Sequence, residues 1–369
     1  MPPQTIRYLS ESVSRRAKPS QGERRAQADT MLMPWERTLE TSRPGLMDTV
    51  RGILRQRLQR CRQQLRPVSA SPAGEDPASK LLAPEDSPAN KPRLLTVDEA
   101  PEHMRFNPYI RTGYRDVLSP AACIESVFWW TNETINIWSH VFGWMLLGGL
   151  GARVLLGYRD IIPPAQLVVF IGVIVCAQIT MALSTLYHVF VCASQRCHEL
   201  FLTLDMLGII ISLLSMFLSG VQYGFWCHEW WRHFYTATVA LMLGVALVAQ
   251  LPWLRVPLLV RQGVLLAWAG YGMVPTVHLA AMHGGWASPV VKIFLPRILE
   301  LYAIGGTAFL IYCTKIPERW FPGRLDVVGS SHQIWHALVV LALYHWYNTG
   351  TLYVVFRITH GCPAYTGML

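Results

Sequence analysis

Residues 166–192 read QLVVFIGVIVCAQITMALSTLYHVFVC and include no Lys, Arg, Asp or Glu. A helix needs roughly 20 mostly apolar residues to cross a hydrocarbon core of about 30 Å. The stretch therefore predicts a transmembrane helix. Six further apolar stretches of similar length lie at residues 137–157, 200–223, 234–252, 260–282, 296–314 and 332–355. We expect an all-α membrane protein with seven transmembrane helices.

The charge composition divides the chain into two parts. Residues 1–136 contain 20 Lys and Arg and 16 Asp and Glu, whereas residues 137–369 contain 12 and 7. Only 15% of the whole chain is charged, against about 25% in a typical soluble domain. This deficit argues against a soluble enzyme and, despite a formal net charge of +9, against a nucleic-acid-binding protein. We expect the first part to face water and the second to lie in a membrane.

The orientation in the membrane is predicted from the basic residues. The loops between the predicted spans carry equal numbers of basic residues on the two sides, so they do not decide it. The N-terminal part carries 20 basic residues and lacks the apolar run of a signal peptide, which predicts a cytosolic N-terminus and a lumenal or outside C-terminus. Cys192 and Cys197 would then lie in a reducing loop. Cys227 and Cys362 would share the oxidising side, where a disulfide between them is allowed.

The N-terminal part divides further by composition. Residues 1–70 are basic, and residues 46–65 repeat apolar positions at steps of three and four between arginines, which predicts a basic amphipathic helix. Such a helix could lie on anionic lipid or in a partner's groove, or it could be a solvated helix with a weak apolar stripe. Residues 71–104 are acidic and rich in Pro, Ser and Ala, as linkers are, so we expect a largely disordered N-terminal region and a membrane domain over residues 105–369.

Several ionisable side chains lie inside predicted spans, where they are costly and usually functional. His188 lies near the cytosolic end of the second span and Asp205 near the cytosolic start of the third. His332 and His336 share one face of the seventh span. Three histidines at one depth suit a zinc ion, with Asp205 positioning a water molecule or acting as a fourth ligand. Ser184, on the same helix face as His188, could add a supporting hydrogen bond.

The alternative for these residues is a set of buried polar side chains that hydrogen-bond between helices. A second polar group lies at the start of the first span and comprises Asn132, Glu133, Asn136 and His140. We expect this group to cap or brace the cytosolic ends of the helices, because it lies where the chain enters the membrane.

Five short motifs are specific in combination. They are Asn132-Glu-Thr-Ile-Asn-Ile-Trp-Ser-His140, Ser184-x-x-x-His188, Leu204-Asp205, Lys315-Ile-Pro-Glu-Arg-Trp-Phe-Pro-Gly323 and Ser331-His-Gln-Ile-Trp-His336. Over about residues 105–369 the chain thereby resembles the progestin and adipoQ receptor family. Three stretches look most like the Golgi member that traps Raf kinase, and the adiponectin receptors are the next most similar. The stretches are Asn107-Pro-Tyr-Ile110, Gly113-Tyr-Arg115 and Gly329-Ser-Ser-His-Gln-Ile-Trp-His336.

The resemblance implies seven transmembrane helices with a cytosolic N-terminus. It also implies a zinc site near the cytosolic face, since the adiponectin receptors bind zinc at positions that match His188, His332 and His336. Asp205 lies opposite those positions. The adiponectin receptors hydrolyse a ceramide amide within the membrane. The Golgi member is instead a scaffold that holds Raf kinase and negatively regulates MAP-kinase signalling.

Two functions follow from the resemblance. The first is a Golgi scaffold whose cytosolic N-terminal region sequesters a Raf-type kinase, although residues 1–100 do not resemble that member's shorter N-terminus. The second is a zinc-dependent ceramide-type amide hydrolase, or a small-lipid receptor, with Asp205 positioning the water. The plasma membrane is the alternative location, and membrane lipids are expected partners in either case.

Overall fold

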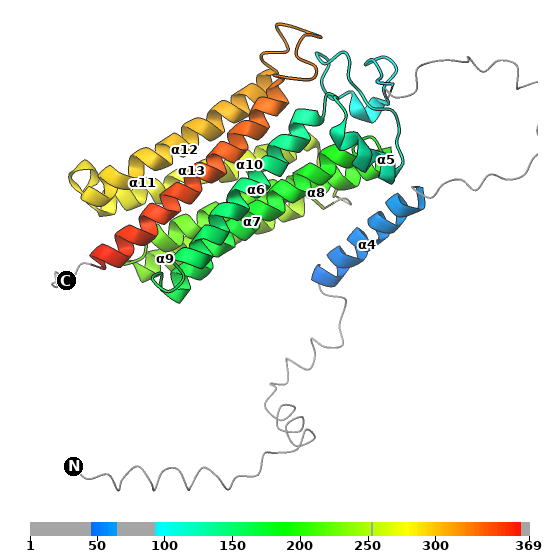
Figure 1. Ribbon diagram of the computed structural model, residues 1–369. Coiled ribbons are helices and arrows are strands. Elements are labelled where there is room, and N and C mark those ends of the chain that lie inside the picture. Colours follow the sequence, from blue (N-terminus) through cyan, green and yellow to red (C-terminus); the bar gives the residue numbers. More distant parts are fainter. Residues whose placement is uncertain (1–45, 65–92, 252–253, 363–369) are drawn as a thin grey trace, which may run out of the picture. The chain divides into compact units, whose positions relative to one another are not determined.

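The computed structural model describes residues 46–64, 93–251 and 254–362. This described part of the chain is helical and contains no β-strand, only an isolated bridge between Leu95 and Tyr114. Seven long helical segments run side by side as a bundle within residues 93–362 (Figure 1). They are α6 (Thr134–Gly157), α7 (Pro164–Phe190), α8 (Gln195–Gly224), α9 (Glu229–Ala249), α10 (Leu258–Tyr271) with α11 (Met273–Met282), α12 (Pro289–Thr314) and α13 (Ser331–His360).

Six of these segments, from α6 to α12, are long and apolar enough to cross a membrane. The seventh, α13, is 30 residues long but carries polar and aromatic residues in its middle, among them His345 and Asn348, which lower its hydropathy. It packs along α12 and α6 as part of the same bundle. The predicted all-α membrane protein with seven transmembrane helices is therefore confirmed, while its orientation in the membrane stays a prediction.

The fifth span is divided into two helices at Gly272. Pro275 follows three residues later, and a proline inside a helix lacks an N–H donor and crowds the carbonyl four residues earlier, here that of Tyr271. Gly272 also lies tightly between neighbours, because a Cβ there would lie 2.4 Å from the Tyr302 hydroxyl and 2.5 Å from the Phe217 ring. The division therefore follows from a proline and from a place where only glycine fits.

Helices α6 and α13 approach closely at Gly143. A Cβ at this position would lie 2.7 Å from a methyl group of Val340 and 2.9 Å from the sulfur of Met181. Ser139 precedes Gly143 by four residues, and His336 precedes Val340 by four. The absence of a side chain at Gly143 thus lets the first and seventh spans bring Ser139 and His336 within reach of one another.

The segment before the first span ties down the start of α13 at one end of the bundle (Figure 1). The amide of Asn107 donates to Glu318 Oε1 at 2.9 Å, and the backbone N–H of Ser331 donates to Glu318 Oε2 at 2.7 Å. The hydroxyl of Thr112 donates to Asp326 Oδ2 at 2.7 Å. Because Ser331 is the first residue of α13, the buried Glu318 fixes the helix end that carries His332.

The N-terminal region is described only in part. Helix α4 (Leu46–Gln64) lies within the stretch for which the sequence predicts a basic amphipathic helix. The remainder of the predicted basic region and the linker residues 71–92 lie outside the described residues. Within the described residues, the Leu95 N–H donates to the Tyr114 carbonyl at 2.7 Å. The boundary at residue 105 stays a prediction.

Two disulfides are present among the described cysteines. Cys227 and Cys362 form the pair that the predicted topology allows. The expectation that Cys197 lies as a thiol in a reducing loop is wrong in this structure, because Cys197 is bonded to Cys61. Cys192 is a thiol, as expected. The spacing of Cys61 and Cys197, 136 residues apart, gave no signal for their pairing.

Candidate metal centre

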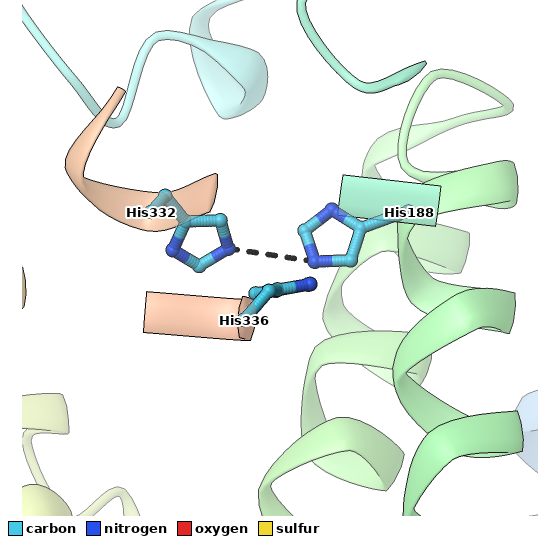
Figure 2. A group of neighbouring side chains, drawn as sticks. All are labelled: His188, His332 and His336. Carbon is cyan, nitrogen blue, oxygen red and sulfur yellow. Dashed lines mark hydrogen bonds between the residues drawn. The ribbon is translucent and has the colours of Figure 1, made fainter. Parts of the chain in front are cut away.

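Three histidine rings converge between α7 and α13 (Figure 2). One nitrogen of each of His188, His332 and His336 lies within 4.8 Å of the others. His188 and His336 are buried, and His332 is half-buried. His188 reaches the cluster from the last turn of α7, while His332 and His336 come from the first two turns of α13, one helical turn apart. The structure thus brings together the three residues that the sequence proposes as metal ligands.

The separation of the ring nitrogens suits a bound metal. His188 Nε2 and His332 Nε2 are 3.4 Å apart, which is long for a direct hydrogen bond. Two nitrogens that each lie about 2.0–2.1 Å from a tetrahedral zinc ion are separated by roughly 3.4 Å. The geometry therefore favours a shared ion over a hydrogen bond between the two rings.

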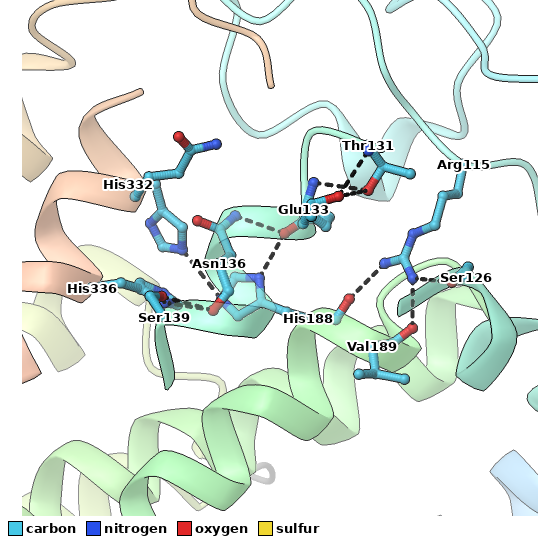
Figure 3. Close-up of polar contacts among 12 residues, drawn as sticks. Arg115, Ser126, Thr131, Glu133, Asn136, Ser139, His188, Val189, His332 and His336 are labelled. Atoms are coloured by element: carbon cyan, nitrogen blue, oxygen red, sulfur yellow. Dashed lines mark hydrogen bonds and ion pairs between the residues drawn. The ribbon is translucent and has the colours of Figure 1, made fainter. Parts of the chain in front are cut away.

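Groups at the start of α6 orient two of the rings (Figure 3). His188 Nδ1 lies 2.7 Å from Glu133 Oε2, and His336 Nδ1 lies 3.1 Å from the Asn136 carbonyl. A carboxylate and a carbonyl only accept, so both Nδ1 atoms carry a proton, and in the neutral ring this leaves the lone pair of Nε2 for a metal. The Asn136 amide donates to Glu133 Oε2 at 2.7 Å and holds that carboxylate in place. Such partners fix the tautomer and direction of metal-binding histidines.

The polar group predicted as a brace therefore includes members that contact the histidines. Glu133 and Asn136 hold His188 and His336, as described above. His140 stacks on His336 with ring centroids 3.9 Å apart and an angle of 12° between the planes. The backbone N–H of Asn132 donates to the Gly113 carbonyl at 3.0 Å.

Arg115 is a buried residue that supports this site, and its role was not predicted from the sequence. Its guanidinium donates to the carbonyls of His188 and Val189, at 2.5 and 3.0 Å, and to the Ser126 hydroxyl at 2.7 Å. The last carbonyls of a helix have no partner within the helix. Arg115 supplies that partner at the end of α7 and thereby fixes the backbone of His188.

The charge state of Glu133 follows from its surroundings. Burial alone would raise the pKa of this carboxyl. Attraction and a hydrogen bond from His188, with smaller contributions from Arg115 and Asn136, bring its pKa down to about 2. Glu133 is therefore an ionised acceptor at neutral pH, as the hydrogen bond from His188 requires.

Ser184 on α7 lies close to the Asp205 carboxylate of the neighbouring helix α8. Among the described residues, the Nδ1 of His188 has Glu133 as its partner. Asp205 lies outside the group of three histidine nitrogens, so it is not a fourth ligand in this arrangement.

A cavity of about 770 Å³ extends from His332 into the bundle. Most of its lining is apolar and comes from α8, α10, α11, α12 and α13. His332, Asp205 and Lys315 line it at the end where α13 begins, and Leu279 and Tyr353 line it farther along the bundle. The arrangement places one candidate metal ligand and one carboxylate on the wall of a space that suits an apolar chain.

We expect Glu133→Gln to weaken zinc binding by about 10–100-fold, because the amide is a weaker acceptor for His188 Nδ1 than the carboxylate. The measurement is zinc competition against a chromophoric chelator, using full-length protein. Glu125→Gln, an exposed carboxylate at the end of α5 (Pro120–Glu125), is the matched control. Equal zinc affinity in the two variants would show that Glu133 does not support the site.

Comparison with known proteins agrees with this architecture. The model of the family described as "Haemolysin-III related" matches residues 128–347. The chain is 38% identical over 291 residues to "Progestin and adipoQ receptor family member 3" of Mus musculus, covering 75% of this chain and 91% of that protein. It is 31% identical over 274 residues to the "Adiponectin receptor protein" of Drosophila melanogaster, covering 70% of this chain and 59% of that protein. It is 28% identical over 319 residues to "Heptahelical transmembrane protein 3" of Arabidopsis thaliana, covering 73% of this chain and 90% of that protein.

Proposed function

Because this chain belongs to the progestin and adipoQ receptor family, we propose that it is a zinc-dependent hydrolase that cleaves the amide bond of a ceramide-type lipid within the membrane. The observation that carries the proposal is the cluster of three histidines beside an apolar cavity of about 770 Å³. A cavity of this volume is within the usual range for small-molecule sites. The likeness to a protein named as an adiponectin receptor adds support.

The residues present fit zinc. Imidazole nitrogens are common zinc ligands, and three protein ligands with one open position are typical of catalytic zinc sites. Glu133 and the Asn136 carbonyl hold the Nδ1 protons of His188 and His336, which leaves Nε2 of each ring available. A zinc ion in this site would polarise the amide carbonyl and lower the pKa of a bound water to about 7.

We assign Asp205 the role of positioning that water and accepting its proton. Asp205 lines the cavity beside His332, and Ser184 lies close to its carboxylate. Since Asp205 is not among the three clustered ligands, it leaves the fourth position open for water. Hydrolysis then transfers the hydroxyl of water to the acyl carbon and a proton to the amine nitrogen. The products are a fatty acid and a sphingoid amine.

The test is fatty-acid release by purified full-length protein in nanodiscs supplied with ceramide that is radiolabelled in its acyl chain. We expect release to fall by at least about tenfold when a chelator removes the metal and to return when zinc is added. Magnesium is the control metal, since it prefers oxygen ligands. Zinc-loaded protein that binds the lipid without releasing labelled acid would instead indicate a small-lipid receptor and would contradict the hydrolase.

A second candidate is the Golgi scaffold that holds a Raf-type kinase. It is favoured by the 38% identity to family member 3, which extends over 91% of that protein. As such a scaffold, the protein would bind the kinase through its cytosolic N-terminal region. A chain lacking residues 1–92 should then lose kinase from Golgi membranes in cells while it keeps its own location. Full retention of the kinase by the shortened chain would exclude docking through the N-terminal region.

A further inference from the structure

The connection between α12 and α13, residues 315–330, separates its charged side chains into a buried set and an exposed set. Its two acidic residues, Glu318 and Asp326, are 0% and 4% exposed. Both accept hydrogen bonds from neighbouring segments, and they thereby anchor the connection at the end of the bundle. Arg319 and Arg324 instead reach the surface. The outer face of the connection is therefore positively charged.

Two large apolar side chains project from the same connection. Trp320 and Phe321 are 66% and 49% exposed, and they lie between the two exposed arginines in the sequence. Tight turns hold this tip, because the Trp320 N–H donates to the Pro317 carbonyl at 2.9 Å and the Arg324 N–H donates to the Phe321 carbonyl at 3.1 Å. Aromatic residues and arginine are enriched at binding interfaces. The tip therefore has the composition of an interaction surface.

A third arginine borders this tip from the segment before the first span. The Gly323 N–H donates to the Tyr109 carbonyl at 3.1 Å, and a Cβ at Gly323 would lie 3.4 Å from Cγ of Arg111. Arg111 is exposed. Within the described parts of the chain, no carboxylate lies within ion-pair distance of this guanidinium or of the two on the connection. The arginine–aromatic surface, as we call it, consists of Arg111, Arg319, Trp320, Phe321 and Arg324.

The arginine–aromatic surface lies where the chain leaves the membrane. Helix α12 is long and apolar enough to cross a bilayer, and the connection begins directly after its last residue, Thr314. In Figure 1 the connection (orange) extends beyond the ends of α12 and α13, at the same end of the bundle as residues 93–118 (cyan). Tryptophan is enriched at the boundary between membrane and water. Basic residues next to a transmembrane helix are attracted to anionic headgroups.

We propose that the arginine–aromatic surface binds the phosphorylated headgroup of an anionic phospholipid in the surrounding leaflet. A guanidinium forms paired hydrogen bonds to phosphate oxygens. Trp320 and Phe321 pack at the level where headgroups meet acyl chains. Three unpaired arginines favour a headgroup with several negative charges, such as that of phosphatidylinositol 4,5-bisphosphate. The proposal goes beyond the proposed function, since it involves neither the three histidines nor the large cavity.

The test titrates dioctanoyl phosphatidylinositol 4,5-bisphosphate and dioctanoyl phosphatidylcholine onto full-length protein in neutral detergent. We expect wild type to bind the bisphosphate at least about tenfold more tightly than the choline lipid. Arg319→Gln/Arg324→Gln should weaken binding of the bisphosphate by about 10–30-fold. The fold should persist, because neither guanidinium is paired within the described residues. Arg153→Gln/Lys292→Gln removes the same charge from exposed positions near the other end of the bundle and should match wild type.

Two further ligands distinguish a lipid from other anions. Soluble inositol 1,4,5-trisphosphate should bind more weakly than the lipid, and Trp320→Ala/Phe321→Ala should weaken binding of the lipid alone. Trisphosphate that binds as tightly as the lipid would overturn the proposal in favour of a site for free phosphates. Tighter binding of a polyglutamate peptide would reassign the surface to an acidic protein partner.

Two results with the lipids themselves would also overturn the proposal. Wild type that binds both dioctanoyl lipids equally would show that no headgroup charge is recognised. Unchanged binding in Arg319→Gln/Arg324→Gln, or an equal loss in Arg153→Gln/Lys292→Gln, would show that the arginine–aromatic surface is not the binding site. The ceramide assay is scored separately, so failure of the hydrolase leaves a headgroup preference at this surface intact.

Discussion

We expect Asp205→Asn to release fatty acid from ceramide at least about a hundredfold more slowly than wild type. The amide has the shape of the carboxylate but cannot accept a proton from water, and removal of a general base typically costs 10²–10⁴-fold in rate. The amide also keeps the size of the carboxylate beside Ser184, so the fold should persist. The rate is measured in nanodiscs under zinc saturation, with zinc per protein determined on the same samples.

The zinc content of this variant separates the two roles considered for Asp205. Because its carboxylate lies outside the cluster of histidine nitrogens, the variant should hold as much zinc as wild type. Loss of zinc together with activity would make Asp205 a ligand instead. Asp160→Asn, an exposed carboxylate in the connection after α6, is the control and should keep full activity. An unchanged rate in Asp205→Asn would end the assignment of Asp205 to the water.

The second large effect is expected for the double variant His332→Ala/His336→Ala. It removes two of the three imidazoles that converge between α7 and α13. A single histidine does not retain zinc against dialysis, since stable protein sites use three or four ligands. We therefore expect about one zinc per wild-type protein and less than about 0.1 per variant. Elemental analysis of purified, dialysed protein gives this ratio directly.

A control on the same helix excludes a general effect of removing histidines. His345→Ala lies farther along α13, where the Nε2 of His345 contacts the Arg297 carbonyl at 2.8 Å. This variant should keep its zinc. Far-ultraviolet circular dichroism of all three proteins shows whether the variants remain helical. A helical double variant that binds zinc as wild type does would mean that the metal lies elsewhere and that the histidines are interhelical polar contacts.

The sequence predicts the parts of this molecule that follow from hydropathy and helical spacing. The uninterrupted apolar run at residues 166–192 predicts α7, because a single segment can satisfy its backbone polar groups in lipid only as a helix. The four-residue spacing of His332 and His336 predicts a shared helix face. Their convergence with His188 was predicted from equal depth in the membrane, and the structure brings the three rings together.

The remaining parts depend on which helix faces which, and a single sequence does not give that. Ser184 could point to either neighbour of α7, and it lies close to Asp205 on α8. Glu133 and Asn136 lie three residues apart, a spacing that places them on one helix face, but only the packing of α6 against α7 and α13 turns them to the histidines. Arg115 comes from outside the spans, so no periodicity connects it to the end of α7.

Zinc K-edge X-ray absorption of purified wild-type protein tests directly whether His188, His332 and His336 bind zinc in a site with one position open to water. We expect three imidazole nitrogens at about 2.0–2.1 Å and one further oxygen. Sulfur scattering at about 2.3 Å, the distance of a cysteine ligand, or wild-type protein that holds no zinc after purification in zinc-containing buffer, would contradict it.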